Sequence, residues 1–389
     1  MSPSFPILPP RMGEAGGQRL SDSRRERFFI RLRRIQNDIF GGKSMSFKVV
    51  QVLDVPGAFM PDYGEMLREA GLEVEFVKKH CTTEDEIIAA AHDADAVVGV
   101  ATFQPFSRKV MQRLTKCRLV QSIGIGYDYL DVEAATEQGI LAINIPDCSL
   151  EEVSDHTMAL ILACTRRIVQ LNDAVKKGGW EAQTDSDIQR GIWPKMSRLC
   201  GQTLGLIGFG RIPRTLVPKA KGFRLRIIAY DPYIPQSLFD ELGVEWVEFD
   251  QLLTESDIIS VHSALTPENR HMLGLTQFKK MKPTAYLINT ARGPLVDHKA
   301  LYAALTEGYL AGAALDVTEP EPIDPDDPLL KLDNVIVTPH SAHFSIPAYM
   351  EQLLRPADEI ARVFKGEWPV GLLNPQVKEK YNQKWGKAR

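Results

Sequence analysis

Short apolar runs alternate with helical patterns along most of the chain. From Phe47 onward, runs rich in Val, Ile and Leu are separated by segments in which apolar residues recur every three or four positions. Continuous apolar runs are typical of strands buried in parallel sheets, and the wider spacing is typical of helices. The first series of predicted strands comprises FKVVQVLD, LEVEFV, DAVVGV, CRLVQSIGIG and LAINIP. This alternation predicts an α/β fold with right-handed crossovers.

A second series of predicted strands begins at Thr203. It comprises TLGLIGFG, RIIAYDP, DIISVHSAL, TAYLINTARG, AGAALDV and NVIVTPH. Between the two series, residues 151–177 form the longest helical pattern, acidic at its start and basic toward its end, as the helix dipole favours. We expect one long helix there, crossing from a first domain to a second. The last helical pattern, IPAYMEQLLRPADEIARVFKG, has no strand after it, so we expect it to return to the first domain.

The length of the chain favours two domains. With 389 residues and 44% hydrophobic composition it can bury a large core. We predict a discontinuous first domain at 45–148 and 345–376 and a second domain at 149–344. No apolar run approaches the ~20 residues that span a bilayer, so we expect no membrane insertion. The five cysteines are scattered and odd in number, which favours a reducing cytoplasm over a disulfide framework or a zinc site.

Residues 1–44 differ in charge from the rest of the chain. They contain nine Lys/Arg and four Asp/Glu, a net charge of +5, so the total of −4 leaves −9 for the remainder. We predict a disordered basic extension. A transit peptide or a nucleic-acid arm is the alternative, but acidic residues interrupt the segment, and the acidic remainder does not favour nucleic-acid binding. Met45 directly precedes the first predicted strand, and we expect it to be the natural start; intact residues 1–44 in an N-terminal mass measurement would contradict this.

The stretch GLIGFGRIP provides a strand, a glycine turn and a helix start in that order. Gly208 allows the turn, and Gly210 lets the backbone approach a pyrophosphate at the helix N-terminus. Asp231 ends the next strand, where a carboxylate binds the adenosine ribose and repels a 2′-phosphate, so NAD is favoured over NADP. Pro213 replaces the third glycine, and we expect Pro218 to kink the helix. The alternative is a plain strand-to-helix turn, which the acid at Asp231 makes the weaker interpretation.

Three polar residues follow strands of the second series: Arg292 in NTARGPLVD, Glu321 in ALDVTEPEP and His340 in VTPHSAH. A guanidinium pairs with a carboxylate through two hydrogen bonds, and an imidazole transfers protons near neutral pH. A carboxylate bonded to the second ring nitrogen orients the imidazole and favours its charged form. Each residue alone is more often structural. Their ordered appearance after successive strands favours the reduction of a 2-oxo acid by hydride transfer.

Seven stretches together carry a specific family resemblance: GIGYDYLDVEAA, GLIGFGRIP, IIAYDPY, VHSALTPENRHML, LINTARGPLVD, GAALDVTEPEP and VIVTPHSAH. From about Ser46 to Gln376 the chain resembles the D-isomer-specific 2-hydroxyacid dehydrogenases, and within them the branch of the C-terminal binding proteins. The resemblance implies a flavodoxin-like substrate domain, a Rossmann NAD-binding domain, substrate bound between the two, no metal and a cytoplasmic homodimer.

The resemblance also implies roles for individual residues. The catalytic set falls on Arg292, Glu321 and His340. Glu321 is preferred over Glu319 because the family's acid precedes the proline that ends the motif DVxxxEP. The implied cofactor contacts, besides Gly208 and Gly210, are Arg211, Ile212, Asp231, Ser263, Thr290, Ala291 and Asp316. The implied contacts of the substrate carboxylate are Thr102, within the loop 101–103, and Gly124, Ile125 and Gly126.

Two positions depart from the family pattern, and the substrate stays open. Ala264 stands where proline or glycine is usual, and His343 stands where an aromatic or small residue often borders the substrate. His343 could narrow the pocket or add a positive charge that favours a second anionic group. The implied function is NAD-dependent interconversion of a D-2-hydroxy acid and its 2-oxo acid. The alternative is a corepressor-like protein that binds NAD(H) with little turnover. Glyoxylate, hydroxypyruvate, pyruvate, phosphohydroxypyruvate and branched 2-oxo acids all remain possible substrates.

Overall fold

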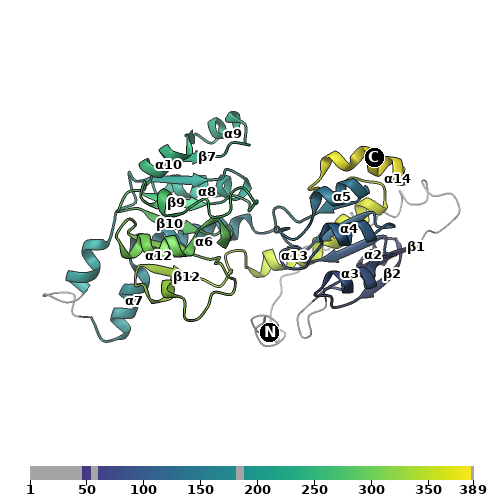
Figure 1. Ribbon diagram of the computed structural model, residues 1–389, viewed down its shortest axis with the longest axis horizontal. Coiled ribbons are helices and arrows are strands. Elements are labelled where there is room, and N and C mark those ends of the chain that lie inside the picture. Colours follow the sequence, from purple (N-terminus) through teal and green to yellow (C-terminus); the bar gives the residue numbers. More distant parts are fainter. Residues whose placement is uncertain (1–45, 54–59, 181–187, 387–389) are drawn as a thin grey trace, which may run out of the picture. The chain divides into compact units, whose positions relative to one another are not determined.

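The computed structural model describes residues 46–53, 60–180 and 188–386. The expected basic extension and the proposed start at Met45 lie outside the described residues. The chain divides into two compact units: unit 1 comprises the residues up to Cys148 and those from Tyr349 onward, and unit 2 is Ser149–Ala348. Each unit contains one sheet (Figure 1). The chain thus returns to unit 1 slightly later than the predicted residue 345.

Unit 1 is built on five parallel strands. They are β1 (Ser46–Gln51), β2 (Glu73–Lys78), β3 (Ala96–Gly99), β4 (Leu119–Ser122) and β5 (Leu141–Ile143). Their order in the sheet is β2-β1-β3-β4-β5, which is the flavodoxin-like order. This confirms the predicted fold class for the first domain.

Two apolar clusters cover the two faces of the sheet in unit 1. On one face lie α3 (Glu84–Ala91), α4 (Arg108–Arg113) and α5 (Val132–Gln138). On the other lie α2 (Tyr63–Glu69), α13 (Ile346–Phe364) and α14 (Lys378–Trp385). The last helical pattern of the sequence therefore packs in unit 1, as expected.

The segment after residue 376, which the family resemblance does not cover, is part of the core of unit 1. Tyr381 of α14 is buried, and the Arg118 guanidinium lies 5.2 Å from the Phe47 ring and 4.8 Å from the Trp385 ring. Phe47 in turn stacks on Phe364 with ring centroids 4.1 Å apart. Contacts between a guanidinium and aromatic rings stabilise this arrangement, so α14 belongs to the folded unit.

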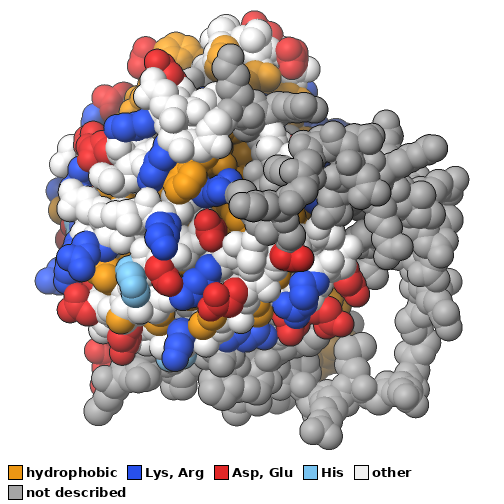
Figure 2. Space-filling model, turned by 90° about the vertical axis from the view of Figure 1, so that its right-hand side faces the viewer, with side chains coloured by type: hydrophobic (Ala, Val, Ile, Leu, Met, Phe, Trp, Pro, Cys, Tyr) orange, Lys and Arg blue, Asp and Glu red, His pale blue; other side chains and the backbone are white. Residues whose placement is uncertain are grey.

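Charged side chains of both signs are interspersed on the face of the molecule in Figure 2. Many charged residues of unit 1 pair with each other: Lys48 Nζ lies 2.8 Å from Asp93 Oδ1, and Lys109 Nζ lies 2.7 Å from Asp85 Oδ1. Exposed pairs of this kind contribute little to stability. The fold of unit 1 therefore depends on its two apolar clusters.

Unit 2 is built on seven parallel strands. They are β6 (Thr203–Ile207), β7 (Arg226–Tyr230), β8 (Glu245–Trp246), β9 (Ile258–Val261), β10 (Tyr286–Asn289), β11 (Gly312–Leu315) and β12 (Val335–Val337). Their order is β12-β11-β10-β9-β6-β7-β8, which is a Rossmann order extended by one strand. The order reverses at β6, where the glycine motif lies. The sequence predicted all of these strands except β8, which has only two residues.

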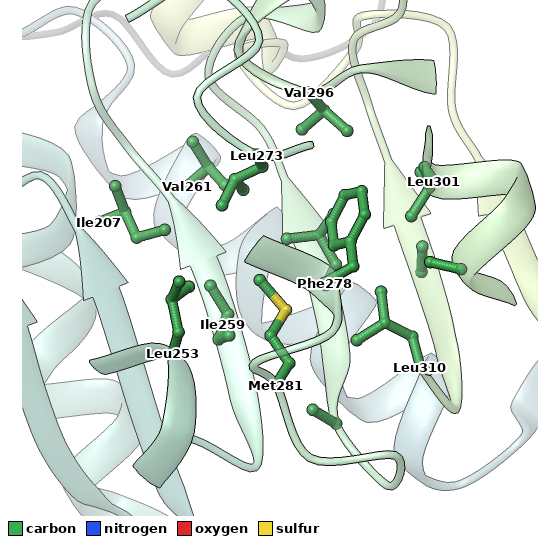
Figure 3. Packing of buried hydrophobic residues seen from close by; sticks show 14 of the residues in the cluster. Ile207, Leu253, Ile259, Val261, Leu273, Phe278, Met281, Val296, Leu301 and Leu310 are labelled. Carbon is green, nitrogen blue, oxygen red and sulfur yellow. The ribbon is translucent and has the colours of Figure 1, made fainter. Parts of the chain in front are cut away.

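The two faces of this sheet are covered by different helices. One cluster, shown in Figure 3, includes residues of α10 (Phe249–Glu255), α11 (Leu275–Phe278) and α12 (His298–Thr306). The other includes residues of α6 (Leu150–Thr165), α8 (Arg211–Gly222) and α9 (Gln236–Glu241). Strand β6 shows the alternation: Ile207 belongs to the first cluster, and Leu204 and Leu206 belong to the second.

The predicted long helix over 151–177 is wrong in one respect, because it is two helices. α6 ends at Thr165 and α7 is Ile168–Lys176, with Arg167 between them in the left-handed region at φ 53°. Arg167 is buried and donates to the Tyr286 hydroxyl at 3.2 Å. This long-range contact stabilises the break between α6 and α7, so the local sequence pattern does not reveal the break. Pro218, where we expected a kink, lies inside α8, which runs from Arg211 to Gly222 as one helix.

Five short helical turns complete the described elements. They are η1 (Ile188–Ile192), η2 (Trp193–Lys195), η3 (Gly293–Leu295), η4 (Pro328–Lys331) and η5 (Pro375–Val377). η3 directly follows Arg292 and therefore belongs to the region of the predicted catalytic residues.

Candidate functional site

The predicted catalytic residues lie at one edge of the sheet in unit 2. Arg292 follows β10, Glu321 follows β11 and His340 follows β12, and these three strands are neighbours in the sheet. A Cβ added at Gly293 would lie 1.9 Å from the Thr318 carbonyl oxygen. Only glycine therefore lets the loop that carries Arg292 approach the loop that leads to Glu321.

His340 is held by its side chain and by its backbone. Its Nδ1 is hydrogen-bonded to Glu321 Oε1. Its backbone N–H donates to the Asp316 carbonyl at 2.8 Å and to the Thr338 carbonyl at 3.0 Å. The residue has φ 51°, a left-handed conformation that costs free energy in a residue other than glycine and persists only where the surroundings fix it. The ring is thereby oriented with Nδ1 toward Glu321.

Glu319, the competing acid, has different partners. Its carboxylate is hydrogen-bonded to Arg270, and its Oε2 lies 2.7 Å from His271 Nε2. Of the two glutamates, the structure thus brings Glu321 to His340.

The Asp316 carboxylate organises the loop that carries His340. Asp316 is only 2% exposed, and its Oδ1 accepts from the Thr338 hydroxyl at 2.5 Å and the Ser341 N–H at 3.0 Å. Its Oδ2 accepts from the Ala342 N–H at 2.9 Å. His156 Nε2, on α6, lies 3.1 Å from Thr338 Oγ1. This buried network over-determines the backbone of residues 338–342.

The loop that carries Arg292 is fixed by a buried amide. Asn289 Nδ2 donates to the Arg292 carbonyl at 2.9 Å, and Asn289 Oδ1 accepts from the Ala291 N–H at 3.0 Å. The Thr290 hydroxyl lies 3.0 Å from the Thr157 hydroxyl of α6. The Arg292 guanidinium donates to the Ala291 carbonyl at 2.7 Å.

Sequence reasoning missed three residues that support these loops: His156, Thr157 and Asn289. His156 and Thr338 are 182 residues apart in the chain, so their pairing has no local signal. One usable signal was present, namely two polar residues directly before the apolar run MALILAC of the helix. Polar residues at the start of a buried helix stretch usually have partners.

The predicted diphosphate-binding residues Gly208, Gly210, Arg211 and Ile212 follow the carboxyl end of β6. Gly208 has φ 92°, and an added Cβ would lie 2.9 Å from both His262 C and Ser263 N, so glycine is required by conformation and by space. A Cβ at Gly210 would meet nothing within 4 Å, so space is open at the start of α8. No side chain caps this helix start, where Arg211 and Ile212 are the first helical residues.

Asp231 lies beside this turn, as the spacing predicted. Its carboxylate accepts from the Phe209 N–H at 2.8 Å and from the Tyr233 N–H at 2.9 Å. Pro213 occupies the first turn of α8, where a missing N–H costs little. An open helix N-terminus with an acid at the end of the neighbouring strand fits the diphosphate and adenosine ribose of NAD.

His262, next to Ser263, is a half-buried histidine whose Nε2 lies 2.8 Å from the Ser260 hydroxyl. Burial lowers the pKa of His262 from its ordinary value near 6.5 to about 3. The unfolded chain therefore binds a proton at this residue between these pH values, and the folded protein does not.

We therefore expect the free energy of unfolding to fall as the pH is lowered from 6.5 toward 3, by up to about 1.4 kcal/mol per pH unit from this residue alone. Urea unfolding at several pH values measures this slope. His262→Gln should reduce the slope, and the matched change at the exposed His80 should leave it unaltered. An identical slope in all three proteins would contradict the prediction.

The predicted carboxylate-binding residues of unit 1 also lie together. The Ser122 hydroxyl accepts from the Ala101 N–H at 3.1 Å and donates to the Gly126 carbonyl at 3.0 Å. The Tyr129 N–H donates to the Ala101 carbonyl at 2.8 Å. Two further bonds hold the glycine loop: Asn144 Nδ2 donates to the Ile125 carbonyl at 2.7 Å, and the Ile145 N–H donates to the Gly124 carbonyl at 2.9 Å. The loop with Thr102 and the loop 124–126 thus form one assembly.

The described residues contain no group of three or more His, Cys, Asp or Glu arranged to hold a metal ion. No helix among residues 46–53, 60–180 and 188–386 is both long and apolar enough to cross a membrane.

Comparison with known proteins follows the same division of the chain. Residues 158–342, within unit 2, match the family model described as D-isomer specific 2-hydroxyacid dehydrogenase, NAD binding domain. The chain is 40% identical over 323 residues to a glyoxylate reductase of Korarchaeum cryptofilum, covering 82% of this chain and 94% of the relative. It is 40% identical over 327 residues to a D-3-phosphoglycerate dehydrogenase of Methanocaldococcus jannaschii, covering 84% of this chain and 59% of the relative.

Among solved structures, a glyoxylate reductase from Paecilomyes thermophila is similar, with a TM-score of 0.74, 26% identity and coverage of 85% of this chain and 99% of that one. Fold, site and relatives together define an NAD-dependent oxidoreductase. The chain belongs to the D-isomer specific 2-hydroxyacid dehydrogenase family. It interconverts a D-2-hydroxy acid and a 2-oxo acid with NAD as cofactor. The predicted family, enzyme class and cofactor are thereby confirmed.

Proposed function

We propose that Arg292, Glu321 and His340 are the catalytic residues of this dehydrogenase. The observation that carries the proposal is the hydrogen bond between His340 Nδ1 and Glu321, at the sheet edge that also carries Arg292. When bound, NADH supplies the hydride that reduces the substrate's C2. His340 Nε2 donates a proton to the carbonyl oxygen, and Glu321 orients the ring through its hydrogen bond to Nδ1. Arg292 pairs with the substrate's carboxylate and polarises the carbonyl.

The binding residues follow from the loops described above. We propose that backbone N–H groups of Thr102, Gly124, Ile125 and Gly126 bind the substrate's carboxylate. Gly208, Gly210, Arg211 and Ile212 hold the diphosphate of NAD, and Asp231 binds its ribose. Further cofactor contacts come from Ser263, Thr290, Ala291 and Asp316. The hydrogen bonds of the Asp316 carboxylate support a second role, that of positioning His340.

NADH oxidation by the full chain against a panel of 2-oxo acids tests the proposed function. We expect turnover with at least one acid, together with the reverse reaction of NAD and the D-isomer of the corresponding hydroxy acid. Tight NADH binding without turnover on any acid would overturn the proposed catalytic assignment.

Asp231 is expected to decide between NAD and NADP. Asp231→Ser should raise the KM for NADH by about 10- to 100-fold, because a hydrogen bond to a charged group is worth about 1.5–3 kcal/mol. It should also permit oxidation of NADPH, since the repulsion of a 2′-phosphate is removed. Steady-state kinetics with both cofactors measures the change. The exposed Asp240 provides the control: Asp240→Ser should leave both KM values unchanged.

We propose a homodimer that forms through unit 2. The segment of α7 and the following residues exposes large apolar side chains, which soluble proteins usually cover: Ile168 is 54% exposed, Trp180 78% and Trp193 43%. Light scattering should give about twice the chain mass of 43.5 kDa, and Ile168→Asp should shift the protein toward monomer. A monomeric parent protein at micromolar concentration would overturn this proposal.

We propose that the protein works in the cytoplasm. All five cysteines are free thiols, with Cys200 exposed and Cys81, Cys117, Cys148 and Cys164 buried. Free thiols of this kind persist in a reducing compartment.

A further inference from the structure

The two loops of unit 1 assigned to the substrate's carboxylate contain no basic residue. Residues 100–107 follow β3 and residues 123–131 follow β4, and neither segment contains Lys, Arg or His. Residues 54–59, outside the described residues, contain none in sequence either. Two acids lie in the second loop: Asp131 caps α5 by accepting from the Ala134 N–H at 2.7 Å, and Asp128 is exposed. The charged side chains of these loops are therefore all negative.

Aromatic rings surround the same loops. Phe103 is 46% exposed, Tyr127 38% and Tyr129 58%. The bond from the Tyr129 N–H to the Ala101 carbonyl joins their two loops side by side. Rings of this size favour contact with apolar groups, and although a tyrosine hydroxyl can donate a hydrogen bond, none of the three carries the positive charge that would neutralise an anion.

Two arginines on neighbouring elements of unit 1 are already paired with acids. Arg108 of α4 lies 3.6 Å from Asp131 of the second loop, measured from Nε to Oδ2, and its guanidinium also pairs with Glu133 and Glu137. The neutral amide of Gln352, on α13, lies against Gly124. Arg355 on the same helix pairs with Asp147, with Nη1 and Oδ1 2.5 Å apart. Lys79 follows β2, which lies two strand positions from β3 and three from β4, about 10 Å and about 14 Å at the usual strand spacing.

In unit 2 the candidate for a second positive charge is His343. Its ring meets that of His340 edge to face, with centroids 5.8 Å apart. Burial lowers the pKa of His343, and the positive charge of His340 lowers it further. The lowered pKa of His343 argues against the positive charge considered from the sequence. Arg270 at the same edge pairs with Glu319.

We propose that this enzyme takes 2-oxo acids whose side chain is uncharged, and that it discriminates against those that carry a phosphate or a second carboxylate. The proposal rests on the proposed function, because it assumes that Thr102 and residues 124–126 bind the substrate's carboxylate. A second anion near these loops would lose water to aromatic rings and meet carboxylates in place of a cation. An apolar or small side chain has no such cost.

Two matched substrate pairs test the proposal with the full chain and NADH. Hydroxypyruvate and phosphohydroxypyruvate differ by a phosphate, and 4-methyl-2-oxopentanoate and 2-oxoglutarate differ chiefly in a terminal carboxylate. We expect kcat/KM to favour the uncharged member of each pair by about 100-fold or more. An equal or reversed preference in either pair would overturn the proposal. If the enzyme reduces none of these four acids and none of the other acids of the panel, the proposed function is overturned instead.

A variant locates the discrimination in the loop after β3. Phe103→Arg places a cation beside Thr102 and should lower the preference for hydroxypyruvate over phosphohydroxypyruvate by about tenfold. Phe103→Leu should keep the preference, and so should Phe223→Arg, which adds the same charge at an exposed phenylalanine of unit 2. Circular dichroism and NADH affinity verify that each variant is folded. A folded Phe103→Arg protein with an unchanged preference would overturn the assignment.

Discussion

Replacing His340 with glutamine is expected to lower kcat for 2-oxo acid reduction by about 10³-fold, because a positioned general acid contributes about 10²- to 10⁴-fold. Glutamine keeps the polarity and much of the size of the side chain and can donate to Glu321. Its amide cannot give up a proton near neutral pH. The proposed diphosphate site at Gly208 and Gly210 follows a different strand, β6, so NADH binding should persist. The expected signature is a loss of kcat with little change in the Kd for NADH.

Steady-state NADH oxidation and NADH fluorescence titration measure the two quantities. The matched control is His80→Gln, since His80 is exposed on unit 1 and belongs to none of the loops proposed to bind substrate or cofactor. If His340→Gln kept more than about a tenth of the parental kcat, His340 would not be the proton donor. Parallel loss of NADH binding and of secondary structure would assign His340 a structural role instead.

The sequence predicted those parts of the fold that local pattern determines. Apolar runs marked every strand of both sheets except β8, because two residues give no periodicity. The break between α6 and α7 escaped detection, since Arg167 leaves the helix to contact Tyr286, 119 residues away. The packing of α14 could not be predicted either, because this helix is short and polar. It is held by the Arg118 guanidinium, which lies against the rings of Phe47 and of Trp385 in α14.

The candidate site divides in the same way. Arg292, Glu321 and His340 could be predicted because each lies in the segment after a strand, and parallel strands bring their carboxyl ends to one edge. His156, which reaches Thr338 from α6, is 182 residues away from it in the chain. Asn289 is close to Arg292 in sequence, but its side chain bonds backbone atoms of the loop, which the sequence pattern does not show. Asp316 was predicted, but only for the cofactor, and its hydrogen bonds to residues 338–342 required coordinates. Long-range polar contacts therefore account for the part of the site that the sequence pattern does not predict.

Glu321 provides the sharper test of the assignment, since Glu319 is a natural control two residues away. Both glutamates precede a proline, and both are hydrogen-bonded to a histidine, Glu321 to His340 and Glu319 to His271. Glu321→Gln should lower kcat by about 10- to 100-fold, because a hydrogen bond that stabilises a charged partner is worth about 1.5–3 kcal/mol. The substitution removes the negative charge beside the His340 ring while keeping a group able to hydrogen-bond.

Glu319→Gln makes the same chemical change in the same loop but disrupts the contacts to Arg270 and His271. Because that pair is partly exposed and lies outside the catalytic set, kcat should change by less than about threefold. Measuring kcat and the NADH Kd of both variants separates the role of the carboxylate at His340 from a general effect on the loop. Equal losses in the two variants would mean that loop structure, rather than the charge of Glu321, supports the reaction. A larger loss in Glu319→Gln would transfer the role to Glu319, against the geometry at His340.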